Sequence, residues 1–150
     1  MFYACEMEYK GERLQSDLQL IPFDCSMFDE YKSIYNECFY DMRKALNVES
    51  FDFLSSADQL KGKTKNIYVL YDKDLIGAVG IYGNEIDDLI VSKKYQNQGF
   101  GKKLLTFAVA KMQKQNISPI KLHVAKWNEN AVELYGNMGF ECVKVEEINI

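Results

Sequence analysis

The chain has 150 residues and a formal net charge of −4, with 47% hydrophobic and 27% charged residues, a composition typical of globular proteins. This length predicts a single domain, residues 1–150, that buries roughly 70% of the surface its unfolded form exposes. No apolar stretch approaches the ~20 residues of a membrane span, and the start lacks the pattern of a signal peptide. The net acidity argues against a general nucleic-acid binder, because phosphates attract a surplus of cations.

The cysteine and histidine content argues against a metal protein. The cysteines, at positions 5, 25, 38 and 142, form no CxxC pair, and the chain has one histidine. Structural zinc needs four Cys or His ligands, usually in closely spaced pairs, so we expect no metal site. We expect reduced thiols in a cytoplasmic protein, although sequence alone leaves disulfides open.

Charge is distributed unevenly along the chain. Residues 1–60 carry a net charge of −7, residues 61–127 carry +7, and residues 128–150 carry −4. A basic middle segment would attract an anionic ligand, and an acidic first segment a cationic one. Solvated surface faces would explain the same pattern without any ligand.

The first half of the chain predicts strands around one long helix. We expect a short strand at Leu18–Ile21, ended by Pro22. Apolar residues at helical spacing predict a helix over residues 27–46, and residues 51–54 suggest a second, short helix. Ile67–Tyr71 and Leu75–Tyr82 read as a β-hairpin.

The second half alternates strands and helices. Strands are expected at Glu85–Val91, Ile120–Ala125 and Phe140–Val145. A helix after Gly101 has the apolar stripe Leu104, Leu105, Ala108, Val109 and Met112, and a shorter one follows Asn128, a plausible N-cap. This succession after a hairpin predicts a mixed sheet with helices on both faces.

One segment joins a strand to a helix through glycines. It reads Leu89-Ile90-Val91-Ser92-Lys93-Lys94-Tyr95-Gln96-Asn97-Gln98-Gly99-Phe100-Gly101-Lys102. The first turn of the helix presents unpaired N–H groups and the positive end of the helix dipole, and glycines let an anion approach closely. These features predict a diphosphate site, although tight packing alone also explains a lone GxG. The Rossmann and P-loop patterns are absent.

A second motif, Asn128-x-x-Ala131-x-x-Leu134-Tyr135-x-x-x-Gly139-Phe140, follows the next strand. With Leu89-Ile90-Val91, Gln96-x-x-Gly99-x-Gly101 and Leu122-x-Val124 in this order, the sequence resembles the GCN5-related N-acetyltransferase (GNAT) family over roughly residues 75–145. The resemblance implies an α/β (α+β) fold. Its central sheet would be mixed and mostly antiparallel, flanked by helices, with a splayed strand pair at the cofactor slot.

The resemblance also implies acetyl-CoA as co-substrate and a primary amine as acceptor, either a small molecule or a peptide. Strand backbone would pair with the pantetheine arm like an added strand, and the pyrophosphate would lie on the N–H groups of residues 97–102. The implied cofactor-binding positions are Leu89, Ile90, Val91, Gln96, Asn97, Gln98, Gly99, Phe100, Gly101, Lys102 and Asn128. For Asn128, a helix cap is the simpler alternative.

Tyr135 matches the family's general acid, which protonates the departing thiolate. A phenol with a pKa of about 10 keeps its proton at neutral pH, although a core aromatic is the alternative role. Three residues are candidates for the base that deprotonates the amine: Glu85, Asp87 and His123. Glu85 and Asp87 share one face of their strand, and His123 lies on the opposite face from its neighbours Leu122 and Val124. A proton relay through water is a fourth possibility.

We therefore expect direct transfer in a ternary complex, with backbone N–H groups stabilising the oxyanion. No Cys has a matched His/Asp arrangement, so an acetyl-cysteine intermediate is not favoured. A catalytically silent acyl-CoA sensor and a nucleotide-binding α/β protein remain alternatives. Aromatic residues of the acidic first segment would line the acceptor slot or belong to the core: Tyr31, Tyr35, Phe39, Tyr40, Phe51 and Phe53. Exposed sheet edges would allow a homodimer.

Overall fold

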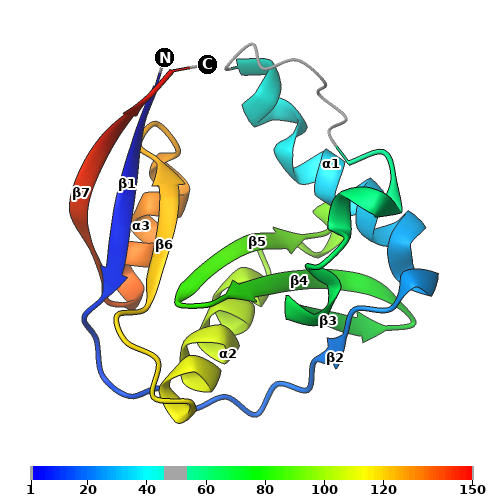
Figure 1. Ribbon diagram of the computed structural model, residues 1–150, viewed down its shortest axis with the longest axis horizontal. Helices are drawn as coiled ribbons and strands as arrows, with labels where there is room; N and C mark the ends of the chain where they lie inside the picture. The colour runs from blue at the N-terminus through cyan, green and yellow to red at the C-terminus, as the bar shows by residue number, and fades with distance from the viewer. Residues whose placement is uncertain (1, 46–53, 150) are drawn as a thin grey trace.

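The computed structural model describes residues 2–45 and 54–149, which form one seven-stranded sheet and three α-helices (Figure 1). The spatial strand order is β2-β3-β4-β5-β6-β1-β7, and every neighbouring pair is antiparallel except β5–β6. The elements are β1 Phe2–Tyr9, β2 Ile21–Pro22, α1 Phe28–Ala45, β3 Ile67–Asp72, β4 Asp74–Tyr82, β5 Glu85–Val91, α2 Phe100–Lys114, β6 Lys121–Ala125, α3 Glu129–Met138 and β7 Phe140–Ile148. The expected mixed, mostly antiparallel sheet is confirmed. None of the described helices is long and apolar enough to cross a bilayer.

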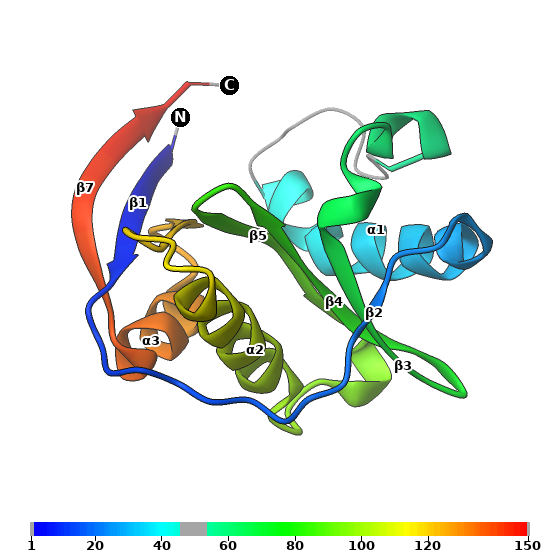
Figure 2. The ribbon, with the colours of Figure 1, turned by 60° about the horizontal axis from the view of Figure 1, so that its bottom comes forward.

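Helices cover both faces of the sheet, as predicted. Figure 2 shows α1 on one side of β4 and β5 and α2 on the other. Each face has its own apolar cluster. Tyr31 and Ile34 of α1 pack with Val69 and Ile90 on one side, whereas the stripe of α2 packs with the other side and with α3. Fully burying side chains of this size contributes ~1.5–3 kcal/mol each, so the two clusters clamp the central strands.

Local signals fixed several element boundaries. The β3–β4 hairpin turns at Lys73, which has a φ of 69°, within the predicted turn sequence. The Asn128 side chain caps α3 by accepting a hydrogen bond from the Ala131 N–H at 3.4 Å, and Gly139 ends it with a φ of 115°. A left-handed residue after a helix is most often glycine, because a side chain is strained there. The short helix predicted at 51–54 lies mostly outside the described residues.

The first twenty residues differ from the prediction. Phe2–Tyr9 forms β1, which was not predicted, and the strand expected at Leu18–Ile21 is wrong. Residues 10–20 form no helix or strand, and their partly buried leucines pack against the cluster around α2. The side chain of Gln113 on α2 secures this segment by accepting from the Leu14 N–H at 2.8 Å. The leucines thus anchor an irregular strap rather than alternating along a strand.

Pro22 was expected to follow a strand and stop it, but it is itself the last residue of β2. β2 is the outermost strand on its side of the sheet. A proline is tolerated at such an edge, because its missing N–H is not needed by a further strand.

We predict that Gly77→Ala destabilises the fold. An added Cβ would lie 2.6 Å from the Ile90 carbonyl oxygen and 2.9 Å from Leu104 Cδ1. Urea unfolding should show a loss of ~1–3 kcal/mol, the usual cost of overpacking a core. Gly136→Ala is the matched control, because no atom lies within 4 Å of its added Cβ in α3. It should gain ~0.5–1 kcal/mol. Equal effects of the two variants would contradict this packing.

Candidate functional site

The sheet divides where β5 and β6 meet. These two parallel strands pair only through Glu85 with Lys121 and Ile86 with Leu122. Beyond this point they diverge, and Figure 1 shows β6, β1 and β7 turning away from β5, β4 and β3. The backbone edge of β5 after Ile86 is therefore left without a strand partner on that side. The splayed strand pair expected from the sequence is present.

Two adjoining cavities occupy the divergence. The inner cavity, of about 120 Å³, lies deeper between β5 and β6 and includes Asp87, Asp88 and His123 in its lining. The outer slot, of about 410 Å³, extends to the start of α2. Five residues line both: Phe39, Leu89, Asn128, Ala131 and Tyr135. Tyr135 thus lies where the two cavities join.

A β-bulge in β5 shapes the inner cavity. Ala78 pairs with Ile90 and Gly80 pairs with Asp87, so Asp88 and Leu89 together oppose the single residue Val79. Asp88 has a φ of 53°, in the left-handed region that Asp adopts more readily than most residues. In a regular strand, Asp87 and Asp88 would point to opposite faces. The bulge instead lets both acidic residues line one cavity.

The outer slot ends at exposed backbone amides. Gly99, with a φ of 86°, starts α2, and Gln96, Asn97, Gly99, Phe100 and Gly101 line the slot. The first N–H groups of a helix have no partner within it. A Cβ on Gly101 would meet no atom within 4 Å, so the backbone there is open to a ligand.

Three of the predicted cofactor positions do not line the slot. Gln98 lies in the glycine turn before α2 and Lys102 in the first turn of α2, but neither residue lines the slot. Ile90 is fully buried in the cluster beneath α1, and it pairs with Ala78.

The backbone of Val91 faces the slot. Ile90 pairs with Ala78, and the Ser92 N–H donates to the Ile76 carbonyl at 2.8 Å. Because alternate residues of an antiparallel strand direct their backbone groups to opposite sides, the groups of Val91 point away from β4. Its carbonyl accepts from the Cys38 thiol at 3.2 Å and from Gln96 Nε2 at 3.0 Å. Both donors are side chains that a strand-like ligand can displace.

The negative charge of Asp87 acts on the Tyr135 phenol. Burial, followed by the negative charge of Asp87, raises the pKa of the Tyr135 phenol. The phenol therefore holds its proton even more firmly than in water. Asp87 keeps contact with solvent, but desolvation by the surrounding protein and the charge of Asp88 raise the pKa of its carboxyl group. A raised pKa makes the Asp87 carboxylate a stronger base.

The structure brings the other two base candidates together. His123 Nδ1 contacts Glu85 Oε1, and His123 Nε2 lies 3.6 Å from Glu6 Oε1. As expected, His123 points away from the buried Leu122 and Val124. His123 lines the inner cavity, whereas Glu85 reaches it only through the histidine. Glu6 was missed because β1 was not predicted.

The contacts between tyrosine hydroxyls and Asp88 were not predicted from the sequence. The Tyr82 hydroxyl donates to Asp88 Oδ2 at 2.7 Å and the Tyr35 hydroxyl to Asp88 Oδ1 at 3.3 Å. Tyr31 packs beside Tyr35, with 5.9 Å between ring centroids. The aromatic residues of α1 were expected either in the core or in an acceptor slot. Phe39 packs against the core and lines the inner cavity, whereas Tyr35 packs against the core and reaches Asp88 with its hydroxyl.

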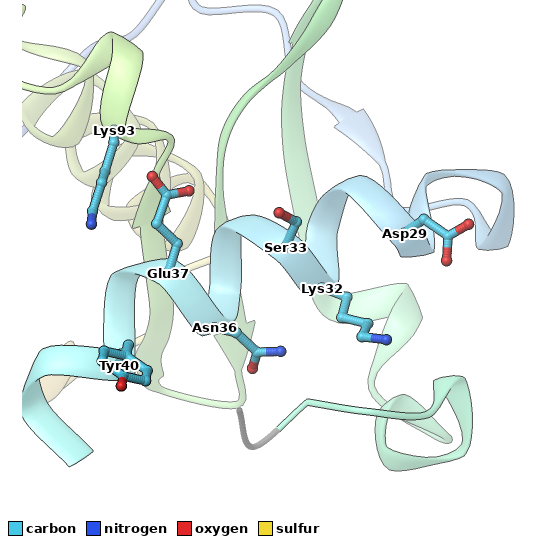
Figure 3. A pocket seen from close by; sticks show the side chains of 7 residues that line it. All are labelled: Asp29, Lys32, Ser33, Asn36, Glu37, Tyr40 and Lys93. Atoms are coloured by element: carbon cyan, nitrogen blue, oxygen red, sulfur yellow. The ribbon is translucent and has the colours of Figure 1, made fainter. Parts of the chain in front are cut away.

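A larger hollow lies on α1, away from Tyr135. Its volume is about 610 Å³, and its lining comes from one stretch of α1 and from Lys93. Figure 3 shows Asp29, Lys32 and Tyr40 projecting in different directions around the helix. No set of its labelled side chains converges on a point, so we assign it no chemistry.

One group in the described part of the chain has metal-ligand types close together. Ligand atoms of Glu6, His123 and Glu146 lie within 4.8 Å of one another. Lys121 Nζ lies 3.8 Å from Glu6 Oε1, and Lys144 Nζ lies 3.4 Å from Glu146 Oε1. The lysines already balance both carboxylates, so nothing here points to a cation.

Comparison with protein families identifies the chain's class. Residues 28–140 match the acetyltransferase (GNAT) family model, and the chain belongs to this family. Two solved GNAT acetyltransferases share the fold. The protein from Colwellia psychrerythraea has a TM-score of 0.67 at 14% identity, covering 95% of this chain and 53% of its own. The protein from Staphylococcus aureus has a TM-score of 0.65 at 20% identity, covering 84% and 85%.

Two curated proteins are similar over half of the chain. L-ornithine N5-acetyltransferase NATA1 of Arabidopsis thaliana is 30% identical over 77 residues, which are 51% of this chain and 34% of that protein. The ribosomal protein bS18-alanine N-acetyltransferase of Haemophilus ducreyi is 35% identical over 81 residues, which are 51% of this chain and 56% of that protein. The chain thus matches about a third and about half of their lengths. The mostly antiparallel sheet also differs from the parallel sheet of dinucleotide-binding folds.

We predict that Asp87→Asn stabilises the protein at neutral pH. A raised carboxyl pKa means that the folded state binds this proton more tightly than the unfolded state does. The stability contributed by Asp87 is therefore present below its unfolded pKa and is lost as the pH rises through the folded pKa. Urea unfolding should show a gain for the variant at pH 7 that shrinks towards pH 3. A gain independent of pH would contradict the shift.

Proposed function

We propose that this protein transfers the acetyl group of acetyl-CoA to a primary amine by direct attack in a ternary complex. Membership of the GNAT family and two named N-acetyltransferase relatives support acetyl transfer. The observation that carries the proposal is the position of Tyr135 at the junction of two cavities, one reaching open helix amides and the other two acidic residues.

The outer slot fits coenzyme A. Unpaired N–H groups at the start of α2, next to glycines without crowding neighbours, suit its diphosphate. The Val91 backbone, directed into the slot, suits an extended amide-bearing arm that pairs like an added strand. Asn97, Gly99, Phe100 and Gly101 would hold the diphosphate, and Leu89 and Val91 the arm. When bound, acetyl-CoA supplies an activated thioester carbonyl.

The residues around the inner cavity would move the protons. Asp87 accepts a proton from the incoming ammonium, because partial desolvation and the charge of Asp88 make its carboxylate more basic. Tyr135 donates its hydroxyl proton to the departing thiolate, since its raised pKa keeps it protonated until that moment. His123, joined to Glu85, offers a second exit for the proton at the other side of the cavity.

We predict that Tyr135→Phe lowers turnover by ~10²–10⁴-fold, the usual contribution of a positioned general acid. Coenzyme A affinity should stay nearly unchanged, because the ring remains in place. Thiol release with an amine panel measures turnover, and calorimetry measures affinity. Tyr71→Phe is the matched control, because its exposed hydroxyl bonds Glu30 outside both cavities. Undiminished turnover in the Tyr135 variant would remove its assigned role.

We predict that Gly101→Ala separates stability from cofactor binding. Alanine suits a helix better than glycine by ~0.5–1 kcal/mol, so the unfolding free energy should rise. The methyl group would occupy space where the diphosphate approaches α2, so coenzyme A should bind about tenfold more weakly, a loss of ~1.4 kcal/mol. Gly136→Ala, on α3 and outside both cavities, should raise stability without this loss. Equal coenzyme A affinity of the two variants would refute the diphosphate site.

The alternative is a catalytically silent acyl-CoA sensor. It predicts the same heat of coenzyme A binding and no thiol release with any amine. Binding without turnover across small amines and peptides would favour this alternative over the enzyme.

A further inference from the structure

Asp88 is an acidic residue that the proposed chemistry does not use. One carboxylate, that of Asp87, suffices to accept the proton of the reacting amine. Asp88 nevertheless lines the same inner cavity, together with Tyr135 and His123. A second carboxylate beside the first costs free energy, because like charges repel, and here it raises the pKa of Asp87. We therefore expect a contact of Asp88 that offsets this repulsion.

No positive group in the described chain forms an ion pair with Asp88. Among residues 2–45 and 54–149, no Lys, Arg or His nitrogen lies within 4.0 Å of its carboxylate. The positive charge of Lys63 acts on Asp87, and its Nζ lies over the Tyr82 ring, 5.4 Å from the ring centre. Phenols hold the carboxylate instead: each oxygen accepts one hydroxyl, from Tyr35 or Tyr82. Each oxygen keeps lone pairs for a further donor.

A second observation is an unpartnered hydroxyl on the same face of α1 as Tyr35. The Tyr31 hydroxyl is fully buried and has no hydrogen-bond partner. Tyr31 lies one turn before Tyr35 on α1, with only 31° between the ring planes, so both rings extend from the same face. After burial, the charge of Asp88 is the largest cause that raises the pKa of Tyr31. Buried polar groups are almost always paired.

We propose that Asp88, oriented by Tyr35 and Tyr82, anchors a second positive charge on the acceptor. The substrate class is then an amine that carries a separate cationic group, and not an amine with a neutral tail. This inference rests on the proposed acetyl transfer and makes it more specific. Asp87 takes the proton of the reacting nitrogen, and Asp88 binds the cation that stays charged. Both contacts are available at once because the bulge directs the consecutive residues into one cavity.

Matched acceptors test the charge directly. Butane-1,4-diamine and pentan-1-amine have the same number of non-hydrogen atoms and differ by one ammonium replaced by methyl. Peptides that begin Ala-Lys and Ala-Met make the same comparison for an N-terminal acceptor. In the pair that reacts, kcat/KM for the cationic member should exceed that for the neutral member by ~10–100-fold, the range of a hydrogen bond to a charged group.

Asp88→Asn should bring this ratio close to one. Asparagine has the same shape and tolerates the left-handed backbone of residue 88, so the variant removes charge and keeps the bulge. Asp29→Asn, on the outer face of α1, removes the same charge elsewhere and should keep the ratio. Tyr35→Phe loses a hydroxyl but no charge and should also retain a preference for the cationic member.

The outcomes separate this inference from the proposed function. Turnover with equal rates for both members of a pair, or a preference that survives Asp88→Asn, overturns the cation anchor and leaves acetyl transfer standing. If no acceptor reacts, acetyl transfer fails, and calorimetry of butane-1,4-diamine with the coenzyme A complex decides the anchor alone. Heat that Asp88→Asn abolishes supports it, and absence of heat refutes it.

Discussion

The site depends on the interruption of one strand pair. β5 and β6 pair through two residues each and then separate, while β5 carries a bulge at the same level. Two strands that pair along their full length leave no backbone edge and no cavity between them. Here the clusters on both faces of the sheet hold β5 in place despite the lost pairing. The fold can therefore keep an unpaired edge in its centre, where the proposed cofactor would pair with β5.

The same interruption organises the electrostatics. Asp87 and Asp88 are forced together, and each carboxylate acts on its neighbours: Asp88 raises the pKa of Asp87, and Asp87 raises that of Tyr135. Desolvation by the surrounding protein has the larger effect in both cases. In the proposed reaction, these shifts suit Asp87 as the base that accepts the proton of the amine. They suit Tyr135 as the acid that keeps its proton until the thiolate departs. The cost is lower stability of the folded chain, which is common where acidic groups serve chemistry.

Much of this arrangement could be predicted from the sequence, and the failures have identifiable causes. The glycine turn before α2, the Asn128 cap and the helical stripes are local patterns, and they led to the correct family. The alternation of Cys5, Met7 and Tyr9 with Glu6 and Glu8 does mark β1, but Cys, Met and Glu are weak strand formers. The strap at residues 10–20 led to the opposite error, a predicted strand that is absent. Its leucines pack against the core, but its backbone forms no strand.

Side-chain alignment across strands was less accessible. The contact between His123 and Glu85 depends on the β5–β6 register, which neither strand encodes alone. Asp88 was overlooked because strict alternation would turn it away from Asp87, and only the bulge reverses that expectation. Of the tyrosines that hold Asp88, Tyr82 lies on the preceding strand β4, but Tyr35 comes from α1, 53 residues away in the sequence. Long-range geometry, rather than composition, assembles this part of the site.

The main-chain character of the β5 edge has an evolutionary consequence. A ligand that hydrogen-bonds to the backbone of an open strand depends little on the side chains there. Mutations of those side chains can therefore accumulate without loss of ligand binding. The side chains are then free to drift towards new acceptors on a constant scaffold. The fold that this chain shares with solved relatives at 14% and 20% identity shows that the backbone arrangement persists while most side chains differ.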